Sequence, residues 1–477
     1  MNDREWIGGA RVAWAARLFV AAFAFNAFSV RTADPDFWGH LAIGRLMFET
    51  GSVPRHDVFS YLPTRDWLNY EWLANLVQYP IHQQLGEPGI VLLKTWVGML
   101  TMMAVYFAAR RRAGSDFTTV LLLIPAIATV ALGFPPRAQI FTYCLFACWL
   151  YALERARAGE WRWLWPLPVT MMLWANLHAG FLAGLGMPVL YAIGQALQRK
   201  PWKPFAATFL VAGALTLVNP YGFKFWLILL EGTTIQRPHI TEWVPVPLDF
   251  TTFPFFKLLC AITLLAIITT RVRDELAALL VLIVTCALGW KVQRHLPFFA
   301  IASALYVPGW LATLIARRRA DRPPPPPALG NSLAGLLAIG ALMVFINGLA
   351  PDGKFSFALD RKVYQFPTKA VAFMQREGLR GNLATEFRWG LFCAWKLYPQ
   401  CKLAVDGRYE TVFDHTVIAE DLAFFYGESP ERFLSKYPTD FVLTDSPPLR
   451  KWLEAQPKVK LIYSDTEAWL YRIEPPT

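Results

Sequence analysis

The sequence is poor in charged residues. Asp, Glu, Lys and Arg make up 17% of its 477 residues, whereas a soluble domain carries about 25%. Several stretches of about 15–20 residues contain almost no charge, and this is the length that crosses a hydrocarbon core of roughly 30 Å. Because 55% of the residues are hydrophobic, the shortage of charge excludes one large soluble core and indicates a membrane protein with many spans.

Several motifs of soluble enzymes are also absent. The sequence contains no Walker phosphate loop, no dinucleotide-binding glycine fingerprint and no zinc-protease helix. The seven histidines are scattered and the cysteines lack metal-ligand spacing, so we expect no metal held by protein ligands and no required cofactor. These absences disfavour both a nucleotide-driven pump and a zinc enzyme.

The six cysteines do not form a disulfide scaffold. Cys393 and Cys401 lie in a part of the chain expected outside the cytoplasm, where oxidation is allowed, and the sequence leaves open whether they pair. The other four fall in predicted spans, where a thiol serves as a small apolar side chain: Cys144, Cys148, Cys260 and Cys286.

The net charge of +11 at first suggests a nucleic-acid partner, but its distribution argues against one. The basic residues cluster in short loops between apolar segments, on alternate sides of the predicted spans. This is the positive-inside pattern of membrane proteins, so the charge reports topology and we expect no nucleic acid partner. The clusters include Arg11 with Arg17, Arg110–Arg112, Arg155 with Arg157, Arg199 with Lys200, and Arg317–Arg319.

We expect about eleven spans within residues 1–350, the first of them retained rather than cleaved. The fifth and sixth could form one bent helix. An odd number of spans places a cytoplasmic N-terminus and residues 351–477 on opposite sides of the membrane, with the long loop 31–88 and the loop 219–252 exoplasmic. The spans cover roughly 12–30, 89–109, 117–134, 140–153, 163–177, 179–198, 204–218, 253–270, 276–290, 297–316 and 331–350.

Residues 351–477 have a different character. Four strand-like runs, "GNLATEF", "CKLAVDGR", "DFVLTD" and "AWLYRI", alternate with helix-like segments such as "PTKAVAFMQREG" and "SPERFLSKYP". Such alternation is typical of a small α/β domain. The predicted fold is therefore mainly α: a polytopic membrane protein of about eleven transmembrane helices with a C-terminal exoplasmic α/β domain.

The polar residues suited to chemistry gather at the predicted exoplasmic ends of the spans. Ionisable groups at membrane depth are expensive and usually face a cavity or a site, so their gathering on one side indicates a polar cavity there. The residues concerned come from five separate loops: Asp34, Asp36, His40 and Glu71; Arg137 and Gln139; Asn176 and His178; Glu242; Lys291, Arg294 and His295.

Each of these motifs also has a structural interpretation. "DPDFWGHL" could begin a helix lying in the membrane interface, with Asp36 as N-cap, Trp38 as interface anchor and an apolar stripe of Phe37, Leu41 and Phe48. Glu71 could be a solvated helix residue and His178 a structural histidine. Arg137 and Arg294 could be interface anchors, and "DGR" at 406–408 a turn after a strand.

The stretches "DPDFWGHLAIGR" and "WLNYEWLANLVQYP" resemble the acidic motif and the two juxtamembrane helices in the first exoplasmic loop of GT-C membrane glycosyltransferases. "WANLHAGFLAG" and the α/β tail are similar to uncharacterised bacterial members. The resemblance implies an enzyme that takes sugar from a polyprenyl-phosphate carrier in the membrane. The acidic motif is Asp-Pro-Asp rather than Asp-Glu, and a later proline-rich motif of some relatives is missing, so sugar and acceptor stay open.

The residues fit an inverting transfer. Four cationic side chains at span ends would bind the donor phosphate by charge-assisted hydrogen bonds: Arg137, Lys291, Arg294 and His295. Asp36 is the expected base for the acceptor hydroxyl, with Asp34 and Glu71 as further candidates. The substrate cavity would contain His40, Gln139, Asn176, His178 and Glu242. A divalent cation bridging Asp34 or Asp36 to phosphate is left open.

Two other functions stay open at this point. A transporter or flippase of a lipid-linked saccharide would also need a polar cavity, but it commonly has polar groups in both membrane halves and an internal repeat. A structural membrane subunit whose tail binds a partner would need no cavity. The one-sided polar groups and the lack of a visible repeat favour the glycosyltransferase.

Overall fold

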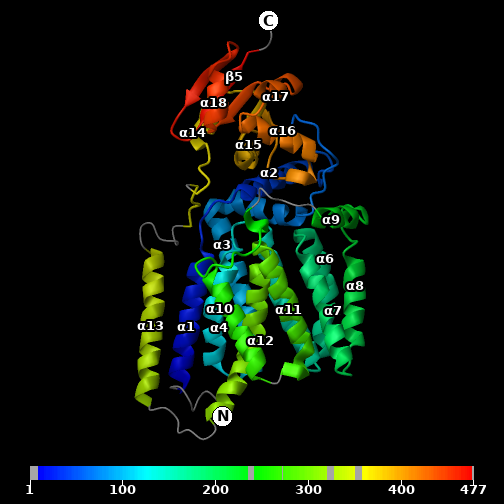
Figure 1. The fold of residues 1–477 in the computed structure, drawn as a ribbon, viewed down its shortest axis with the longest axis vertical. Helices are drawn as coiled ribbons and strands as arrows, with labels where there is room; N and C mark the ends of the chain where they lie inside the picture. Colours follow the sequence, from blue (N-terminus) through cyan, green and yellow to red (C-terminus); the bar gives the residue numbers. More distant parts are fainter. Residues whose placement is uncertain are drawn as a thin grey trace. The chain divides into compact units, whose positions relative to one another are not determined.

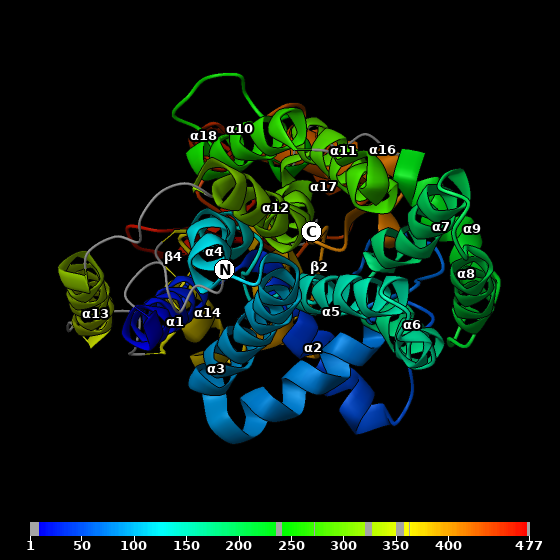
Figure 2. The ribbon, with the colours of Figure 1, turned by 90° about the horizontal axis from the view of Figure 1, so that it is seen from below.

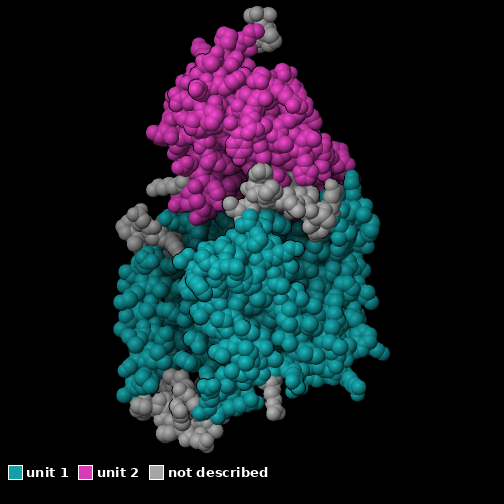
Figure 3. Space-filling view, in the orientation of Figure 1, with its two compact units in different colours: residues 1–31, 87–358 teal, residues 32–86, 359–477 magenta. Residues whose placement is uncertain are grey.

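The computed structural model describes residues 9–234, 241–270, 272–319, 327–349, 357–361 and 363–474. The described chain is mainly helical, with a small sheet near its C-terminal end (Figure 1). It divides into two compact units, which we call unit 1 and unit 2 (Figure 3). Unit 1 contains residues 1–31 and 87–358, and unit 2 contains residues 32–86 and 359–477.

Unit 1 is helical, and all eleven predicted apolar segments coincide with helices in it. Gly86 (φ 65°, ψ −158°) interrupts α3 at the boundary between the units. In the described part, the helices of unit 1 are α1 (Gly9–Phe28), the second half of α3 (Trp72–Ala113), α4 (Asp116–Ala131), α5 (Gln139–Arg157), α6 (Leu167–Leu177), α7 (Phe181–Leu197), α8 (Lys203–Leu215), α9 (Lys224–Thr234), α10 (Pro254–Thr269), α11 (Leu276–Lys291), α12 (Leu296–Arg319) and α13 (Pro327–Leu349).

Four helical segments are long and apolar enough to cross a membrane: Gly9–Phe28, Trp72–Ala113, Gln293–Arg318 and Ala328–Leu349. Shorter apolar helices accompany them, so the number of spans stays a prediction. The fifth and sixth predicted spans are separate helices, because the backbone is extended at His178, between α6 and α7. Exposed apolar side chains such as Leu336 and Met343 on α13 need an apolar surrounding, which a membrane supplies.

Within unit 1, α12 packs against α4, α10 and α11 (Figures 1 and 2). The buried Lys94 of α3 joins this bundle to α1. Its ammonium donates to the carbonyl oxygens of Phe28 (2.7 Å), at the end of α1, and Phe134 (3.1 Å), beyond the end of α4. Carbonyls at helix ends lack intrahelical partners, so one buried cation satisfies two of them.

Unit 2 is built around a five-stranded sheet of order β2-β1-β3-β5-β4. β1 runs parallel to β2 and β3, while β5 runs antiparallel to β3 and β4, and Leu383 pairs with Leu403 on one side and Phe441 on the other. The strands are β1 (Gly381–Thr385), β2 (Cys401–Leu403), β3 (Phe441–Thr444), β4 (Val459–Ser464) and β5 (Trp469–Ile473). The helices are α2 (Pro35–Thr50), the first part of α3, α14 (Thr368–Arg376), α15 (Gly390–Leu397), α16 (His415–Phe425), α17 (Pro430–Lys436) and α18 (Pro447–Glu454).

The predicted α/β tail is therefore confirmed, and each of the four strand-like runs contains a strand. The sequence did not indicate β4, because this outer strand is half exposed and lacks a run of buried apolar residues. The two cysteines of the tail do not pair: Cys393 and Cys401 are both free and buried. Burial raises the pKa of Cys393 to about 12 and of Cys401 to about 11, so both remain protonated thiols.

The first loop belongs to the same unit as the tail. The Leu403 N–H of β2 donates to the Phe59 carbonyl (2.7 Å), and the Tyr61 N–H donates to the Leu403 carbonyl (3.0 Å). The Ser60 hydroxyl donates to the carbonyls of Leu403 (3.0 Å) and Ala404 (2.9 Å). These bonds place a segment of residues 31–88 beside β2, which is why this loop groups with residues 359–477 rather than with the apolar helices.

A buried guanidinium reinforces this union. Arg408 follows β2 and donates to both carboxylate oxygens of Asp406 (Nε–Oδ1 2.9 Å, Nη2–Oδ2 2.7 Å) and to Asp57 of the first loop. It lies 5.1 Å from the ring centroid of Phe59 and 4.8 Å from that of Trp67. Burial alone would lower the pKa of the guanidinium, but the two carboxylates outweigh burial and raise it.

Glu386 forms a second, partly buried polar site, directly after β1. Its Oε1 accepts a hydrogen bond from the Thr444 hydroxyl (2.6 Å) at the end of the neighbouring β3. Burial raises the pKa of Glu386 to about 7, and the Asp445 carboxylate adds to this rise. Burial likewise raises the pKa of Asp421, on α16, well above its ordinary value. Two carboxyl groups with raised pKa values therefore lie near the carboxyl ends of the parallel strands.

Replacing Arg408 with Met should lower the free energy of unfolding of unit 2 by about 3–5 kcal/mol, because two buried carboxylates lose their counter-charge. Chemical denaturation of the detergent-solubilised chain, followed by tryptophan fluorescence, measures the effect. Arg450→Met is the matched control, since Arg450 pairs with Glu454 at an exposed position. Equal stability of the two variants would contradict the structural role of Arg408.

Glu386 should make unit 2 less stable as the pH rises. An unfolded glutamate titrates near pH 4.5, so between pH 4.5 and 7 the folded chain keeps a proton that the unfolded chain has released. This contribution to stability is complete below pH 4.5 and is lost as the pH rises through 7, at a cost of about 3 kcal/mol. Glu386→Gln should therefore gain stability relative to wild type between pH 5 and pH 8.

Melting temperatures of wild type and Glu386→Gln at pH 5 and pH 8 test this expectation. Glu428→Gln, at an exposed position of the same unit, is the matched control. The same difference between wild type and Glu386→Gln at both pH values would show that the pKa of Glu386 is not raised in the folded state.

Candidate functional site

The twelve predicted site residues fall into two sets, one in each unit. Unit 2 contains the expected catalytic carboxylates and one cavity residue: Asp34, Asp36, Glu71 and His40. Unit 1 contains the expected phosphate ligands and the rest of the cavity: Arg137, Gln139, Asn176, His178, Glu242, Lys291, Arg294 and His295.

The two aspartates of unit 2 stand at the beginning of α2. Asp34 is the N-cap: its backbone is extended (φ −78°, ψ 142°), and its Oδ1 accepts from the backbone N–H of Asp36 at 2.9 Å. Pro35 occupies the first helical turn, where its missing N–H costs no hydrogen bond. Asp36 was expected to cap this helix, and that expectation is wrong. The cap role is taken by the buried Asp34, while Asp36 is only half-buried.

α2 does not have a single apolar face, because it is a core helix of unit 2 whose residues 37–44 are all buried. Phe37, Trp38 and Leu41 are buried, and the Trp38 ring meets the ring of Phe392 edge-on at 5.2 Å between centroids. Trp38 is therefore a core residue and not an interface anchor. Phe48, expected in the same stripe as Phe37 and Leu41, is 57% exposed.

His40 lies one turn after Asp36 and belongs to a buried chain of polar side chains. Its Nδ1 is 2.6 Å from Oδ1 of Asn75, and the Asn75 amide donates to Oδ1 of Asn69 at 3.2 Å. Glu71 approaches the same imidazole, with its Oε2 3.9 Å from Nδ1. The structure thus brings together two predicted residues, Glu71 and His40, and fixes the ring orientation of the histidine through Asn75.

In unit 1 the structure brings Arg137, Glu242 and Arg294 together. Oε1 of Glu242 is 2.9 Å from Nη1 of Arg137 and 3.1 Å from Nη1 of Arg294. Arg294 also lies over the ring of Trp243, at 5.6 Å from its centroid. We call these three charged residues the arginine pair and its carboxylate. Burial alone would raise the pKa of Glu242, but the two guanidiniums outweigh it and lower the pKa below its ordinary value.

Short elements hold this cluster in place. Glu242 lies in the 3₁₀ turn η3 (Thr241–Trp243). Two backbone hydrogen bonds join the segment after this turn to the end of α11 and to η5 (Gln293–His295). The Val246 N–H donates to the Trp290 carbonyl (3.0 Å), and the Gln293 N–H donates to the Val244 carbonyl (3.1 Å).

Gln139 and His295 lie close to the arginine pair and its carboxylate, whereas the side chain of Lys291 is exposed to the surroundings. Gln139 donates to the Tyr143 hydroxyl, which in turn donates to the backbone carbonyl of Arg294 (3.1 Å). The His295 ring is 6.5 Å from that of Trp243, between centroids. Lys291 is exposed at the end of α11.

Asn176 and His178 have local structural partners in unit 1. The Asn176 amide donates to the carbonyls of Met172 (2.8 Å) and Val218 (2.9 Å). Nδ1 of His178 accepts from the backbone N–H of Gly180 (2.9 Å) and lies 2.9 Å from the Thr142 hydroxyl. These bonds favour the structural interpretation of the turn between α6 and α7. The place of Asn176 and His178 in a substrate cavity stays a prediction.

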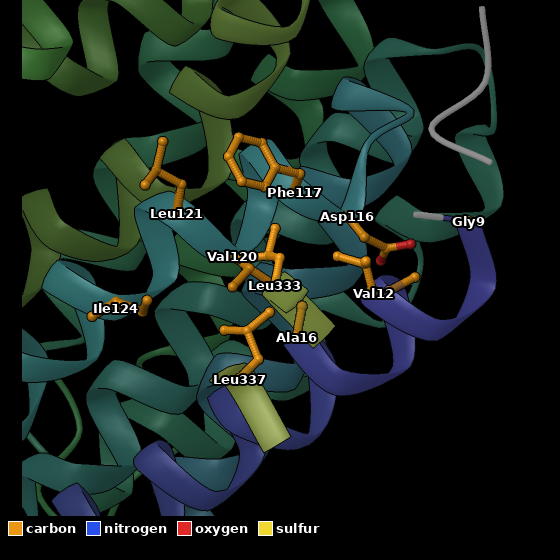
Figure 4. Close-up of a pocket in the computed structure, with 11 residues that line it drawn as sticks. Gly9, Val12, Ala16, Asp116, Phe117, Val120, Leu121, Ile124, Leu333 and Leu337 are labelled. Atoms are coloured by element: carbon orange, nitrogen blue, oxygen red, sulfur yellow. The ribbon is translucent and has the colours of Figure 1, made fainter. Parts of the chain in front are cut away.

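A groove in unit 1 lies apart from all twelve residues. It has a volume of about 170 Å³ and is formed by α1, α4 and α13 (Figure 4). Its walls are apolar except for Asp116, and none of the predicted site residues lines it. Among the described residues, no group of three or more His, Cys, Asp or Glu side chains is placed to hold a metal ion.

The ion pairs of Arg408 were not predicted from the sequence. "DGR" was interpreted as a turn after a strand, and the chain does turn there, but Asp406 and Arg408 also form the buried ion pair with Asp57. Its only signal in the sequence is a pair of opposite charges beside a run of buried apolar residues.

Comparison with known proteins gives no match to a protein-family model and none to a curated protein. Solved structures do match. The oligosaccharyltransferase of Archaeoglobus fulgidus in its apo form superposes with a TM-score of 0.61 and 12% identity, over 91% of this chain and 69% of that chain. The oligosaccharyltransferase AglB of the same organism, in complex with an inhibitory peptide and a dolichol-phosphate, gives 0.60 and 12% over the same shares.

ArnT from Cupriavidus metallidurans in the apo state matches with a TM-score of 0.57 and 13% identity, over 97% of this chain and 99% of that chain. Such identities speak for the fold alone. AglB and ArnT are both GT-C glycosyltransferases. The chain therefore has the fold of the GT-C membrane glycosyltransferases that its acidic motif and juxtamembrane helices resemble.

Proposed function

We propose that this protein is an inverting glycosyltransferase that moves a sugar from a polyprenyl-phosphate carrier to an acceptor on the exoplasmic side of a bacterial inner membrane. The observation that carries the proposal is the arginine pair and its carboxylate, in a fold shared with AglB, whose solved complex contains a dolichol-phosphate. Acceptor and sugar remain open in the proposal, and no cofactor is required.

The arginine pair is suited to a lipid phosphate. Arg137 and Arg294 stand at the ends of apolar helices, where the phosphate of a membrane-bound carrier lies, and both are largely buried. Partly buried guanidiniums form strong charge-assisted bonds to phosphate oxygens. In the transfer step they stabilise the charge that develops on the leaving phosphate, so that no general acid is needed. Lys291 and His295 are further phosphate ligands of the proposal.

Asp36 is the proposed base. The acceptor hydroxyl oxygen attacks the anomeric carbon, and the new C–O bond forms as the bond from that carbon to the phosphate oxygen breaks. The hydroxyl proton passes to the Asp36 carboxylate, and the bonding electron pair leaves with the carrier phosphate. A single displacement inverts the anomeric carbon. Asp34 supports this role as the cap that fixes the start of α2, and Glu71 is the alternative base.

Asp36→Asn should keep the fold, because amide and carboxylate have nearly the same size and Asp34 provides the helix cap. We expect turnover to fall by about 10²-fold or more, the scale of a lost general base. The assay is sugar transfer from a polyprenyl-phosphate sugar by purified protein. Asp66→Asn, at an exposed carboxylate of the same loop, is the matched control. Normal turnover in Asp36→Asn would remove Asp36 from the mechanism.

Arg137→Ala and Arg294→Ala should each weaken donor binding by about 1.5–3 kcal/mol, the range for a hydrogen bond to a charged group. Equilibrium binding of a fluorescent polyprenyl phosphate measures this loss. Arg162→Ala, at an exposed position of unit 1, is the control for lost positive charge. Unchanged affinity in both variants would identify the two arginines as structural ligands of Glu242.

The proposal requires a cytoplasmic N-terminus and an exoplasmic domain after residue 351, as the alternating basic clusters predict. A protease-cleavable tag at residue 477 should be cleaved from outside in spheroplasts, and a tag at residue 1 should be protected. The reverse result would contradict both the topology and the assigned side of the reaction.

A further inference from the structure

We propose that the segment Asp406–Arg408 of the C-terminal part is a positioning element for Asp36. The inference rests on the proposed function, since it gives Asp36 its catalytic role. It concerns contacts inside unit 2 alone, between α2 of the first loop, α15 and the turn that follows β2.

The turn is anchored on one side by Arg408. This guanidinium is bonded to Asp406 in its own turn and to Asp57 in the first loop, and the rings of Phe59 and Trp67 lie against it. The Arg408 backbone N–H also donates to Oδ1 of Asp406 at 3.0 Å. With both carboxylates buried, the turn has little freedom to shift, because any displacement would separate charges in an apolar surrounding.

On its other side the turn meets the catalytic carboxylate. A Cβ placed on Gly407 would stand 3.2 Å from Oδ1 of Asp36 and 2.8 Å from Cδ1 of Leu391. The first distance is shorter than an ordinary van der Waals contact. The anchored turn therefore lies against the Asp36 side chain, and a side chain at 407 would force Asp36 and Leu391 to shift.

Leu391 connects the turn to α2 a second time. The same methyl group would lie 2.8 Å from a Cβ on Gly39, which is one turn along α2 from Asp36, so Leu391 fills the space between the two glycines. Next to it, a Cβ on Gly390 would stand 2.7 Å from Cβ of Asp406. The glycines at 39, 390 and 407 thus allow α2, the start of α15 and the turn to pack closely against one another.

This arrangement serves a reaction in which the base must be held still. Misplacing a catalytic group by about 1 Å can cost on the order of 10²-fold in rate. Because the lipid tail fixes the depth of the donor's reacting carbon, the carboxylate has to be held at that same depth. The Asp406–Arg408 turn supplies this support to Asp36 from outside the helix that bears it.

Gly407→Ala tests the proposal. We expect kcat for transfer from a polyprenyl-phosphate sugar to fall about 10-fold or more, while KM for the donor changes less than about 2-fold. Gly186→Ala is the matched control, because a Cβ at Gly186 meets nothing within 4 Å. It should leave both constants unchanged.

The decisive measurement is the same substitution in an Asp36→Asn background. If Gly407 acts through Asp36, Gly407→Ala should slow that variant less than about 2-fold, because the group it positions no longer acts as a base. An equal loss in both backgrounds, or no loss in the wild-type background, would overturn the proposal.

Amide hydrogen exchange separates this proposal from the proposed function. Absence of transfer by the wild-type protein would contradict the function alone. In that case, faster exchange of residues 34–44 in Gly407→Ala than in wild type and in Gly186→Ala supports the positioning of α2 by the turn. Unchanged exchange overturns it.

Discussion

A buried guanidinium is stable only among carboxylates, and unit 2 depends on this constraint at Arg408. The partners Asp57 and Arg408 are 351 positions apart in the sequence. Removing Arg408 would leave the carboxylates of Asp57 and Asp406 uncompensated in an apolar surrounding, so this guanidinium ties the first loop to the C-terminal sheet. The backbone bonds of Phe59 and Tyr61 to β2 follow from this pairing, because they need the same segment beside the same strand. The division of the chain into its two units is therefore an electrostatic result as much as a hydrophobic one.

The same constraint organises unit 1 at both ends of α5. Near the start of α5, Glu242 lies between Arg137 and Arg294. Near its end, Arg112 contacts Glu154 and Glu275, and Arg157 bonds to Glu154 as well. Charges at the ends of apolar helices are costly unless they are paired, and the paired ones tie neighbouring helices together. The two ends differ in what is left over. Near the end of α5, two positive charges (Arg112 and Arg157) balance two negative charges (Glu154 and Glu275). Near its start, the two positive charges of the arginine pair face the single negative charge of Glu242, so one positive charge is in excess.

Much of the fold was predictable because it depends on local patterns. Each of the eleven apolar segments coincides with a helix. The alternation of strand-like and helix-like segments after residue 351 predicts the α/β part. Both predictions succeed because the length and periodicity of an apolar run depend only on consecutive residues. Arg137, Arg294 and Glu242 were singled out because charge beside an apolar run is equally local. The failures concern contacts that no local pattern contains. Trp38 was expected in an interface, because its ring partner Phe392 is remote in the sequence and could not be foreseen. Arg408 was interpreted as part of a turn for the same reason, since its ionic partner Asp57 is also remote. The N-cap was misassigned between two aspartates separated by one proline, where only the backbone angles of Asp34 decide.

The carboxylate between the two arginines also bears on the proposed reaction. Arg137 and Arg294 carry two positive charges and Glu242 one negative charge, so the cluster has a net charge of about +1 while the pKa of Glu242 stays below its ordinary value. A sugar linked to a polyprenyl chain through one phosphate bears a single negative charge and would neutralise the cluster. After transfer, the carrier phosphate has lost an ester and bears between one and two negative charges near neutral pH. The product then bears more negative charge than these three residues balance by themselves. Under the proposed function, Glu242 thus does more than orient two guanidiniums: by cancelling one of their two positive charges it weakens their attraction for the phosphate of donor and product alike, which helps the carrier to leave.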